Sequence, residues 1–166
     1  MPISMISPTE MSRWALSPPI VHVVARTGAL AAADRRWAPA LRTLRGLRKR
    51  GRRSIRIVDV NCGDGSLLIQ VVRAARSLGF VAIEGRGVDR DPVLVTAARL
   101  SSALLKDRAI GLTFDAGEGA NALHEEAELP ADLVFYAEDD AGAAALAGMA
   151  GVAAFGLPDS LKRIAT

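Results

Sequence analysis

The spacing of apolar residues along this chain alternates between the two-residue period of strands and the 3.6-residue period of helices from residue 54 onward. The predicted strands are residues 55–60, 80–88, 110–114, 131–136 and 152–155, and the predicted helices are residues 66–78, 91–104, 121–128 and 140–150. Asp91 followed by Pro92 is a typical helix start, with an N-cap acid and a proline in the first turn. Regular alternation predicts an α/β fold with a doubly wound, mostly parallel sheet and right-handed crossovers. Ligands of such sheets bind at the carboxyl ends of the strands.

The region before residue 54 is predicted to be helical. A helix over residues 20–33 would begin after Pro19 and pack over the rest of the chain or act as a lid. A second, amphipathic helix is predicted up to about Gly51, because one helical stripe contains Trp37, Leu41, Leu44 and Leu47. We therefore divide the chain into an N-terminal helical cap with a basic helix, residues 1–53, and a Rossmann-like domain, residues 54–166.

The composition excludes several protein classes. The chain is 50% hydrophobic and 23% charged, a composition that is too apolar for intrinsic disorder. Its length of 166 residues corresponds to about one domain. A single cysteine, Cys62, excludes an intrachain disulfide, and together with two histidines it cannot form a structural zinc site. The first residues do not resemble a secretory signal, and the alanine- and glycine-rich stretch 141–158 predicts a buried helix and strand rather than a membrane span. We therefore expect a cytoplasmic protein without a metal site.

The charge is unevenly distributed along the chain. The net charge of +3 combines +10 over residues 35–56 with −7 over residues 57–166. The basic segment is interpreted either as the solvated outer face of a packed helix or as a surface for RNA or an acidic partner. No aromatic residues alternate with its cations, which disfavours binding of single strands by base stacking.

The segment from Asp59 to Gly65 contains the strongest chemical signal. An acid ends a buried strand, a turn with two glycines follows, and a helix then begins. Glycine allows a left-handed backbone and a close approach to a ligand, and the free N–H groups at a helix start favour polar or anionic groups. The nicotinamide fingerprint would require glycine at position 68, where the chain has Leu68. A nicotinamide-dependent oxidoreductase is therefore disfavoured.

This segment resembles motif I of the class I S-adenosylmethionine-dependent methyltransferases. Asp59, Gly63 and Gly65 match the acid and the last two glycines of that motif, and Asn61 takes the place of its first glycine. Asparagine is the best substitute for glycine in left-handed geometry. The resemblance covers about residues 54–140 and implies that S-adenosylmethionine is the cofactor, with S-adenosylhomocysteine as its product. The contacts implied for this loop come from Asp59, Val60, Asn61, Gly63 and Gly65.

Acids after the next two strands extend the resemblance. In the family, the acid at the end of the second strand binds both ribose hydroxyls, which assigns that role to Asp89, with Arg90 beside the adenine. After the third strand, Gly117 and Glu118 stand where the family has Gly-Asp, so the resemblance assigns Glu118 to the adenine amino group. Asp115 is the alternative for that role.

Two features of the family are absent from the sequence. The full fold ends in an antiparallel hairpin, for which the residues after 156 do not suffice, so we predict a sheet of five strands in the order 3-2-1-4-5. The exposed edge predicts a homodimer or a partner that covers it. The strand 131–136 is not followed by the acceptor signature of the amine methyltransferases. No catalytic residue is assigned, although four side chains are candidate bases by position, namely His22, Tyr136, Glu138 and Asp139.

The sequence thus favours a small methyltransferase with an unidentified acceptor. The alternatives are a non-catalytic, degenerate module that binds S-adenosylmethionine or a protein partner, and an RNA-modifying or RNA-binding protein that uses the basic segment. Cys62 is interpreted as a small loop residue, and His124, beside two glutamates, as an exposed one.

Overall fold

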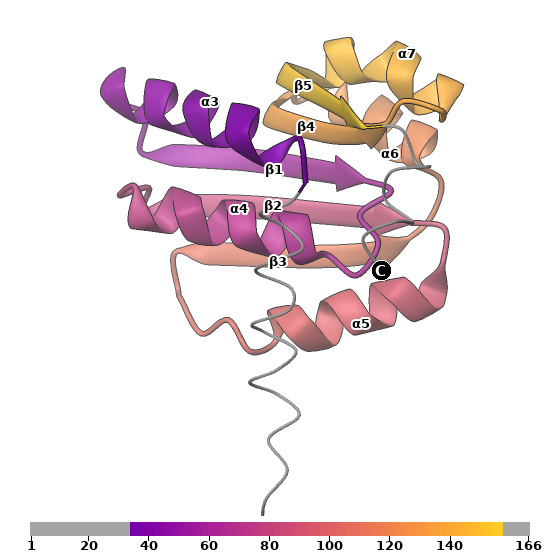
Figure 1. The fold of residues 1–166 in the computed structure, drawn as a ribbon, viewed down its shortest axis with the longest axis horizontal. Helices are drawn as coiled ribbons and strands as arrows, with labels where there is room; N and C mark the ends of the chain where they lie inside the picture. The colour runs from indigo at the N-terminus through magenta and orange to yellow at the C-terminus, as the bar shows by residue number, and fades with distance from the viewer. Residues whose placement is uncertain (1–33, 158–166) are drawn as a thin grey trace, which may run out of the picture.

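The computed structural model describes residues 34–157, which form one parallel sheet flanked by helices (Figure 1). Its strands have the order β3-β2-β1-β4-β5, and every neighbouring pair is parallel. The elements are α3 (Trp37–Lys49), β1 (Ser54–Val60), α4 (Ser66–Ser77), β2 (Ala82–Asp89), α5 (Pro92–Ser102), β3 (Ile110–Ala116), α6 (Gly119–Glu126), β4 (Ala131–Ala137), α7 (Ala141–Ala150) and β5 (Gly151–Leu157). The predicted fold class and strand order are confirmed. The predicted helix 20–33 and the predicted lack of a C-terminal hairpin concern residues outside the described range.

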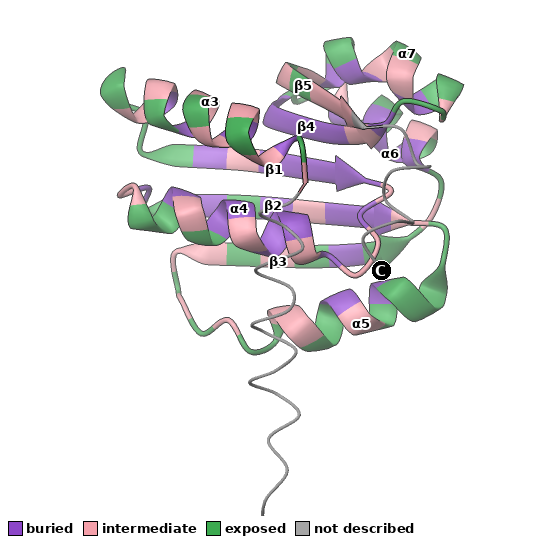
Figure 2. Ribbon diagram, viewed as in Figure 1, coloured by how far each residue is buried: buried purple, intermediate pink, exposed green. Residues whose placement is uncertain are grey.

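The two faces of the sheet are covered by different helices. Helices α3, α4 and α5 lie on the face toward the viewer in Figure 1, and α6 and α7 lie behind the sheet. One core cluster contains residues of α3, α4 and α5, and the other contains residues of α6 and α7. Strands β1 and β4 are almost continuously buried because both of their faces are covered, whereas the edge strand β3 is largely exposed (Figure 2).

Helix α3 belongs to the first of these cores. It buries Ala40, Leu44 and Leu47, while Arg42 and Arg45 lie on its exposed side, as the amphipathic pattern predicts. It packs on α4 and β5, and it runs from the carboxyl ends of the strands back to the start of β1. The division of the chain at residue 53 stays a prediction, although the described part of the cap shares the core of the sheet.

The observed helix and strand limits lie within two residues of the predicted ones. Helix α4 ends at Ser77, and Gly79 follows with a φ of 92°, which allows Phe80 N–H to donate back to Ala75 O at 3.2 Å. This turn places Phe80 in the core, so β2 begins at Ala82 rather than at residue 80. Helix α6 begins at Gly119, two residues before the predicted start, and ends at Glu126. Asp91 is the predicted N-cap of α5, since its carboxylate accepts from Val93 N–H at 2.8 Å.

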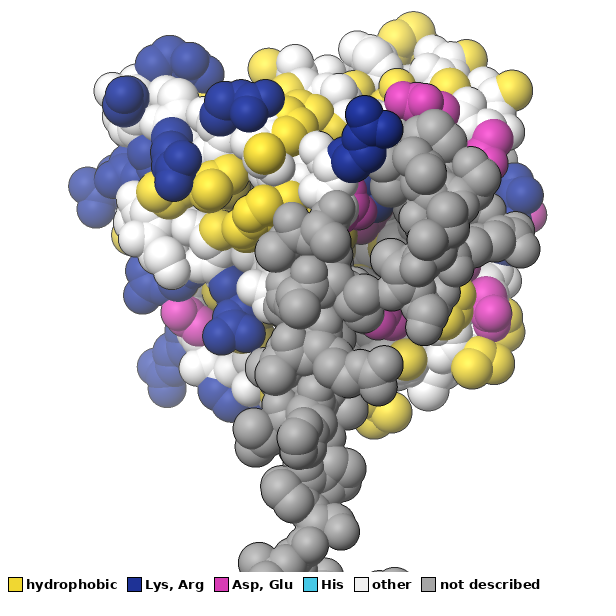
Figure 3. All heavy atoms as spheres, viewed as in Figure 1, with side chains coloured by type: hydrophobic (Ala, Val, Ile, Leu, Met, Phe, Trp, Pro, Cys, Tyr) yellow, Lys and Arg dark blue, Asp and Glu magenta, His cyan; other side chains and the backbone are white. Residues whose placement is uncertain are grey.

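Charge is segregated along the strand direction. Figure 3 shows that most visible Lys and Arg side chains lie toward the end of the molecule where the strands begin. Not all of these cations are solvated, because Arg48 donates to Leu78 O and Arg52 O. Within the described part of the chain, no helix is long and apolar enough to cross a membrane.

Candidate functional site

The loop between β1 and α4 has the backbone that the sequence pattern predicts. Asn61, Gly63 and Gly65 have φ values of 62°, 59° and 73°, and Asn61 is the one non-glycine residue with positive φ among those described. Asparagine therefore stands in place of the first glycine of the motif, and the backbone at this position keeps its left-handed geometry. Gly65 is also the N-cap of α4, so the loop delivers the chain directly to the start of that helix.

Two hydrogen bonds, donated by the loop and accepted at the end of β2, hold this loop in place. Cys62 N–H donates to Val88 O at 3.0 Å, and Gly63 N–H donates to Asp89 Oδ2 at 2.7 Å. The other oxygen, Asp89 Oδ1, accepts from Asp91 N–H at 2.9 Å. The structure thus brings the two parts of the predicted site together through a direct bond, with the Asp89 carboxylate against the glycine loop.

The loop also packs against the sheet through side chains. A Cβ atom on Gly65 would lie 2.7 Å from Phe114 Cε1, so glycine is needed there for space as well as for its φ. A Cβ on Gly63 would have no atom of residues 34–157 within 4 Å, so none of these residues fills the space on that side of the loop. Cys62 is buried, as expected for a small loop residue.

Arg36 is the site residue that the sequence analysis did not identify. Its side chain is 4% exposed and donates to both carboxylate oxygens of Asp34, at 3.1 and 2.8 Å. Its Nη1 lies 3.8 Å from Oδ1 of Asp59, and its guanidinium carbon lies 5.7 Å from the centre of the Phe135 ring. Burial alone would lower the pKa of Arg36, but the charge of Asp59 and the hydrogen bond to Asp34 outweigh it, so the pKa is raised.

The motif I acid is therefore inside the protein rather than at its surface. Asp59 is fully buried, next to Phe135 of β4 and Gly87 of β2 in the sheet register. Arg36 reaches it because α3 begins above the carboxyl ends of β1 and β4. The sequence signal for this contact is weak, since it consists only of an acid and an arginine two residues apart before an amphipathic helix.

A second charged group connects the loops after β2, β3 and β4. Arg90 Nη2 lies 2.5 Å from Glu118 Oε2 and 3.4 Å from Asp140 Oδ2. Gly117 N–H donates to Asp89 O at 2.9 Å, which fixes the β3 end beside the β2 end. Two residues assigned separately to the adenine, Arg90 and Glu118, thus form an ion pair with each other.

The alternative adenine ligand faces elsewhere. The Asp115 carboxylate lies 3.8 Å from Arg86 Nε and 3.6 Å from Arg99 Nη2, and neither arginine belongs to the group of Arg90. Asp115 belongs to β3 itself, whereas Glu118 follows that strand and pairs with Arg90, the residue next to Asp89.

The candidate bases fall into different surroundings. Glu138 is exposed just after β4, and Tyr136 is half-buried near the end of that strand. His22 lies outside the described residues, and His124 is exposed on α6, as predicted. Asp139 is exposed next to Glu138.

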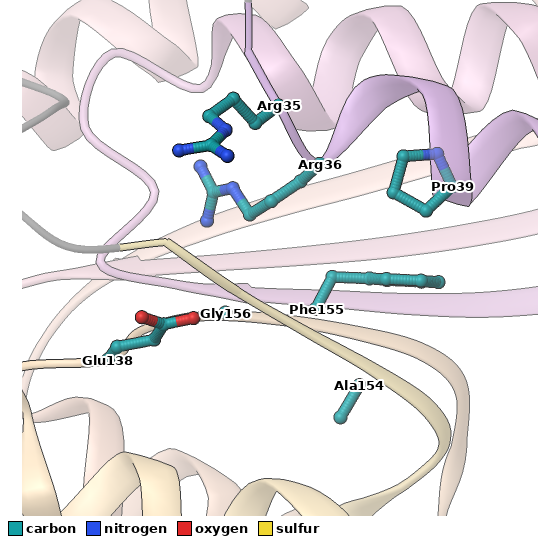
Figure 4. Close-up of a pocket in the computed structure, with 7 residues that line it drawn as sticks. All are labelled: Arg35, Arg36, Pro39, Glu138, Ala154, Phe155 and Gly156. Carbon is teal, nitrogen blue, oxygen red and sulfur yellow. The ribbon is translucent and has the colours of Figure 1, made fainter.

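A hollow of about 450 Å³ opens beside these residues, between the start of α3 and strand β5 (Figure 4). It is lined by Arg35, Arg36, Pro39, Glu138, Ala154, Phe155 and Gly156. Its volume is in the range of small-molecule sites. Arg36 both lines this hollow and contacts Asp59, so the hollow adjoins the motif I acid.

Comparisons with known proteins place the fold. No protein-family model matches the chain, and no curated protein matches its sequence. A candidate caffeoyl-CoA O-methyltransferase from Staphylococcus aureus has a TM-score of 0.50 and 11% identity, over 85% of this chain and 63% of its own. A candidate class I S-adenosylmethionine-dependent methyltransferase (lmo1582) from Listeria monocytogenes has a TM-score of 0.45 and 26% identity, over 59% of this chain. MnmC2 from Aquifex aeolicus has a TM-score of 0.43 and 21% identity, over 57% of this chain and 36% of its own.

These solved structures are longer than the part they share with this chain. The chain spans 27% of the Listeria protein and less than two thirds of the Staphylococcus protein. The strand order and the Staphylococcus structure together show that this chain has a Rossmann-like, methyltransferase-like α/β fold.

Proposed function

We propose that this protein binds S-adenosylmethionine at the carboxyl ends of β1, β2 and β3 and transfers its methyl group to a small acceptor. The observation that carries the proposal is the loop after β1. Three of its positions have left-handed φ, and a carboxylate from the end of β2 holds it through Gly63 N–H. This arrangement supports binding of a nucleoside with a polar tail along the strand ends.

The described residues fit such a cofactor in two respects. No described residue lies within 4 Å of the place where a Gly63 Cβ would stand, which leaves space among these residues for a ligand at the loop backbone. Asp89 accepts one backbone N–H at each oxygen, and a carboxylate has about four lone-pair positions, so two remain for ribose hydroxyls. Glu118 reaches the adenine amino group if its ion pair with Arg90 is shared or opened, which is feasible because both side chains are more than half exposed.

Near the methionine end, the chain supplies fixed charges. Asp59 and Arg36 form a buried pair whose geometry is set before any ligand arrives, which limits reorganisation on binding. The cofactor supplies an activated methyl group, so the protein's task is alignment more than covalent chemistry. Methyl transfer breaks one sulfur–carbon bond, forms one bond between the methyl carbon and the acceptor, and releases the acceptor's proton. Glu138, which lines the adjoining hollow, is the candidate to take that proton.

Thermal unfolding with S-adenosylhomocysteine tests the cofactor proposal. A ligand at about 100 times its Kd adds about 2.7 kcal/mol to the free energy of unfolding. For a chain of this size we expect a rise in Tm of roughly 5–10 °C. Asp89→Asn is expected to lose most of this rise relative to its own ligand-free Tm, because the amide presents one acceptor oxygen instead of two.

The matched control is Asp115→Asn, which removes the same charge from an acid that faces Arg86 and Arg99. Its response to S-adenosylhomocysteine should equal that of the unmodified chain. An equal rise with NADH, or a full rise in Asp89→Asn, would contradict the proposal.

The comparisons do not support the alternatives of a non-catalytic module or an RNA-binding protein. Turnover with any acceptor distinguishes an enzyme from a module. The cytoplasmic location and the homodimer stay predictions.

A further inference from the structure

The hollow beside the proposed cofactor site has two chemically different walls. Arg35 and Arg36 precede α3 and Pro39 belongs to its first turn, whereas Glu138 follows β4 and the other three, Ala154, Phe155 and Gly156, belong to β5 (Figure 4). The proposed cofactor contacts use none of these residues except through Arg36 and its neighbour Asp59.

The two arginines of this hollow differ in how far their charge is already neutralised. Arg36 is buried, pairs with Asp34 and Asp59, and donates to Tyr136 O at 3.4 Å. Arg35 is exposed, and no carboxylate among the described residues forms an ion pair with it. Arg35 therefore offers the hollow a guanidinium whose donors are available to a ligand. Guanidinium groups bind carboxylates and phosphates through two parallel hydrogen bonds.

The wall opposite Arg35 is flat and apolar, with one carboxylate. The Phe155 ring is stacked on Phe135 with ring centres 5.5 Å apart, which holds it in place. Glycine at 156 gives Glu138 its room, since a Cβ there would lie 2.8 Å from Glu138 Oε1 and 2.9 Å from Tyr136 Cζ. Phe155 and Pro39 thus present apolar surface to the hollow, and the Arg35 guanidinium and the Glu138 carboxylate are among its other lining groups (Figure 4).

We propose that this hollow is the acceptor subsite and that it takes a small acid with a planar apolar body. The acid group binds Arg35, the body lies against Phe155, and the nucleophilic hydroxyl or amine faces Glu138. This inference rests on the proposed methyl transfer for its purpose, but the recognition of the acid rests on Arg35 and the hollow alone.

The test measures binding of two probes that differ only in charge, 3-hydroxybenzoate and 3-hydroxybenzamide, to the full 166-residue chain with S-adenosylhomocysteine present. Calorimetry or ligand-observed NMR gives both Kd values. We expect the acid to bind about tenfold more tightly than the amide, because a charge-assisted hydrogen bond is roughly twice as strong as a neutral one. Arg35→Gln should reduce this preference to less than about threefold, as expected when the ligand's charge loses its partner.

The matched control is Arg42→Gln, since Arg42 is an exposed arginine of α3 that does not line the hollow. It should leave the preference unchanged, and Glu138→Gln should not weaken binding of the acid. Equal binding of the two probes, no measurable binding of either, or a preference that survives Arg35→Gln would overturn the proposal. Titration of separate, ligand-free samples of the same proteins with S-adenosylhomocysteine distinguishes the acid site from the proposed methyltransferase function. If S-adenosylhomocysteine does not bind but the acid is still preferred in a way that depends on Arg35, the methyltransferase function is contradicted and the acid site is supported.

Discussion

Replacing Arg36 by methionine is expected to lower the free energy of unfolding by about 3–5 kcal/mol, which is the usual cost of removing one partner from a buried ion pair. Methionine fills much of the same volume but has no charge to face Asp59. It also removes both hydrogen bonds that Arg36 makes to the Asp34 carboxylate and the contact with the Phe135 ring. Urea unfolding at neutral pH, followed by circular dichroism, measures the change.

Two variants separate this effect from a general loss of charge. Arg35→Met removes the same charge one residue earlier from an exposed side chain, and it should change the free energy of unfolding by no more than about 0.5 kcal/mol. Asp59→Asn in the Arg36→Met background should recover part of the loss, because the buried carboxylate that the methionine leaves behind is then neutral. A loss below about 1 kcal/mol in Arg36→Met would show that the pair does not stabilise the fold.

The alternation of strands and helices could be predicted from the sequence because each element has its own apolar period. The runs around Ile57 and Leu133 are strands buried on both faces, and each is short and rich in branched or large apolar residues. The strand order required more than periodicity. It came from the resemblance to the methyltransferases, and the parallel pairing of β4 with β1 and β5 confirms it.

The site could be predicted only where its residues are close in sequence or occupy strand ends. The loop from Asp59 to Gly65 has a local signature, and Asp89 follows the next strand. Their direct contact, through Gly63 N–H and Asp89 Oδ2, confirms that they share one edge, while their cofactor roles stay predictions.

The role of Arg36 depends on tertiary structure and could not be predicted from the local sequence. Its contact with Asp59 requires α3 to run back along the sheet, so that its first turn lies over β1 and β4. The pairing of Arg90 with Glu118 and Asp140 likewise depends on how three loops meet, which no periodicity specifies. The apolar stripe and the charge count predicted a basic helix, but they did not predict that Arg36, just before it, is buried.

Alanine at Gly65 is expected to cost about 2–5 kcal/mol in the free energy of unfolding, since two separate penalties act there. The left-handed backbone at φ 73° disfavours a Cβ by roughly 1–2 kcal/mol. In addition, the Cβ would lie 2.7 Å from Phe114 Cε1 and 3.0 Å from Ala98 Cβ, and relief of such overpacking typically costs about 1–3 kcal/mol. Chemical denaturation of the purified variant measures the sum.

Gly63→Ala isolates the first penalty, because Gly63 has a φ of 59° but open space where its Cβ would stand. It should cost only the roughly 1–2 kcal/mol of backbone strain. In Gly65→Ala combined with Phe114→Leu, the two substitutions should be less harmful together than their separate costs imply, because the smaller side chain removes the clash with the new methyl group. If Gly63→Ala and Gly65→Ala cost the same, Phe114 does not support the loop. The left-handed turn alone would then hold the backbone that the proposed cofactor requires.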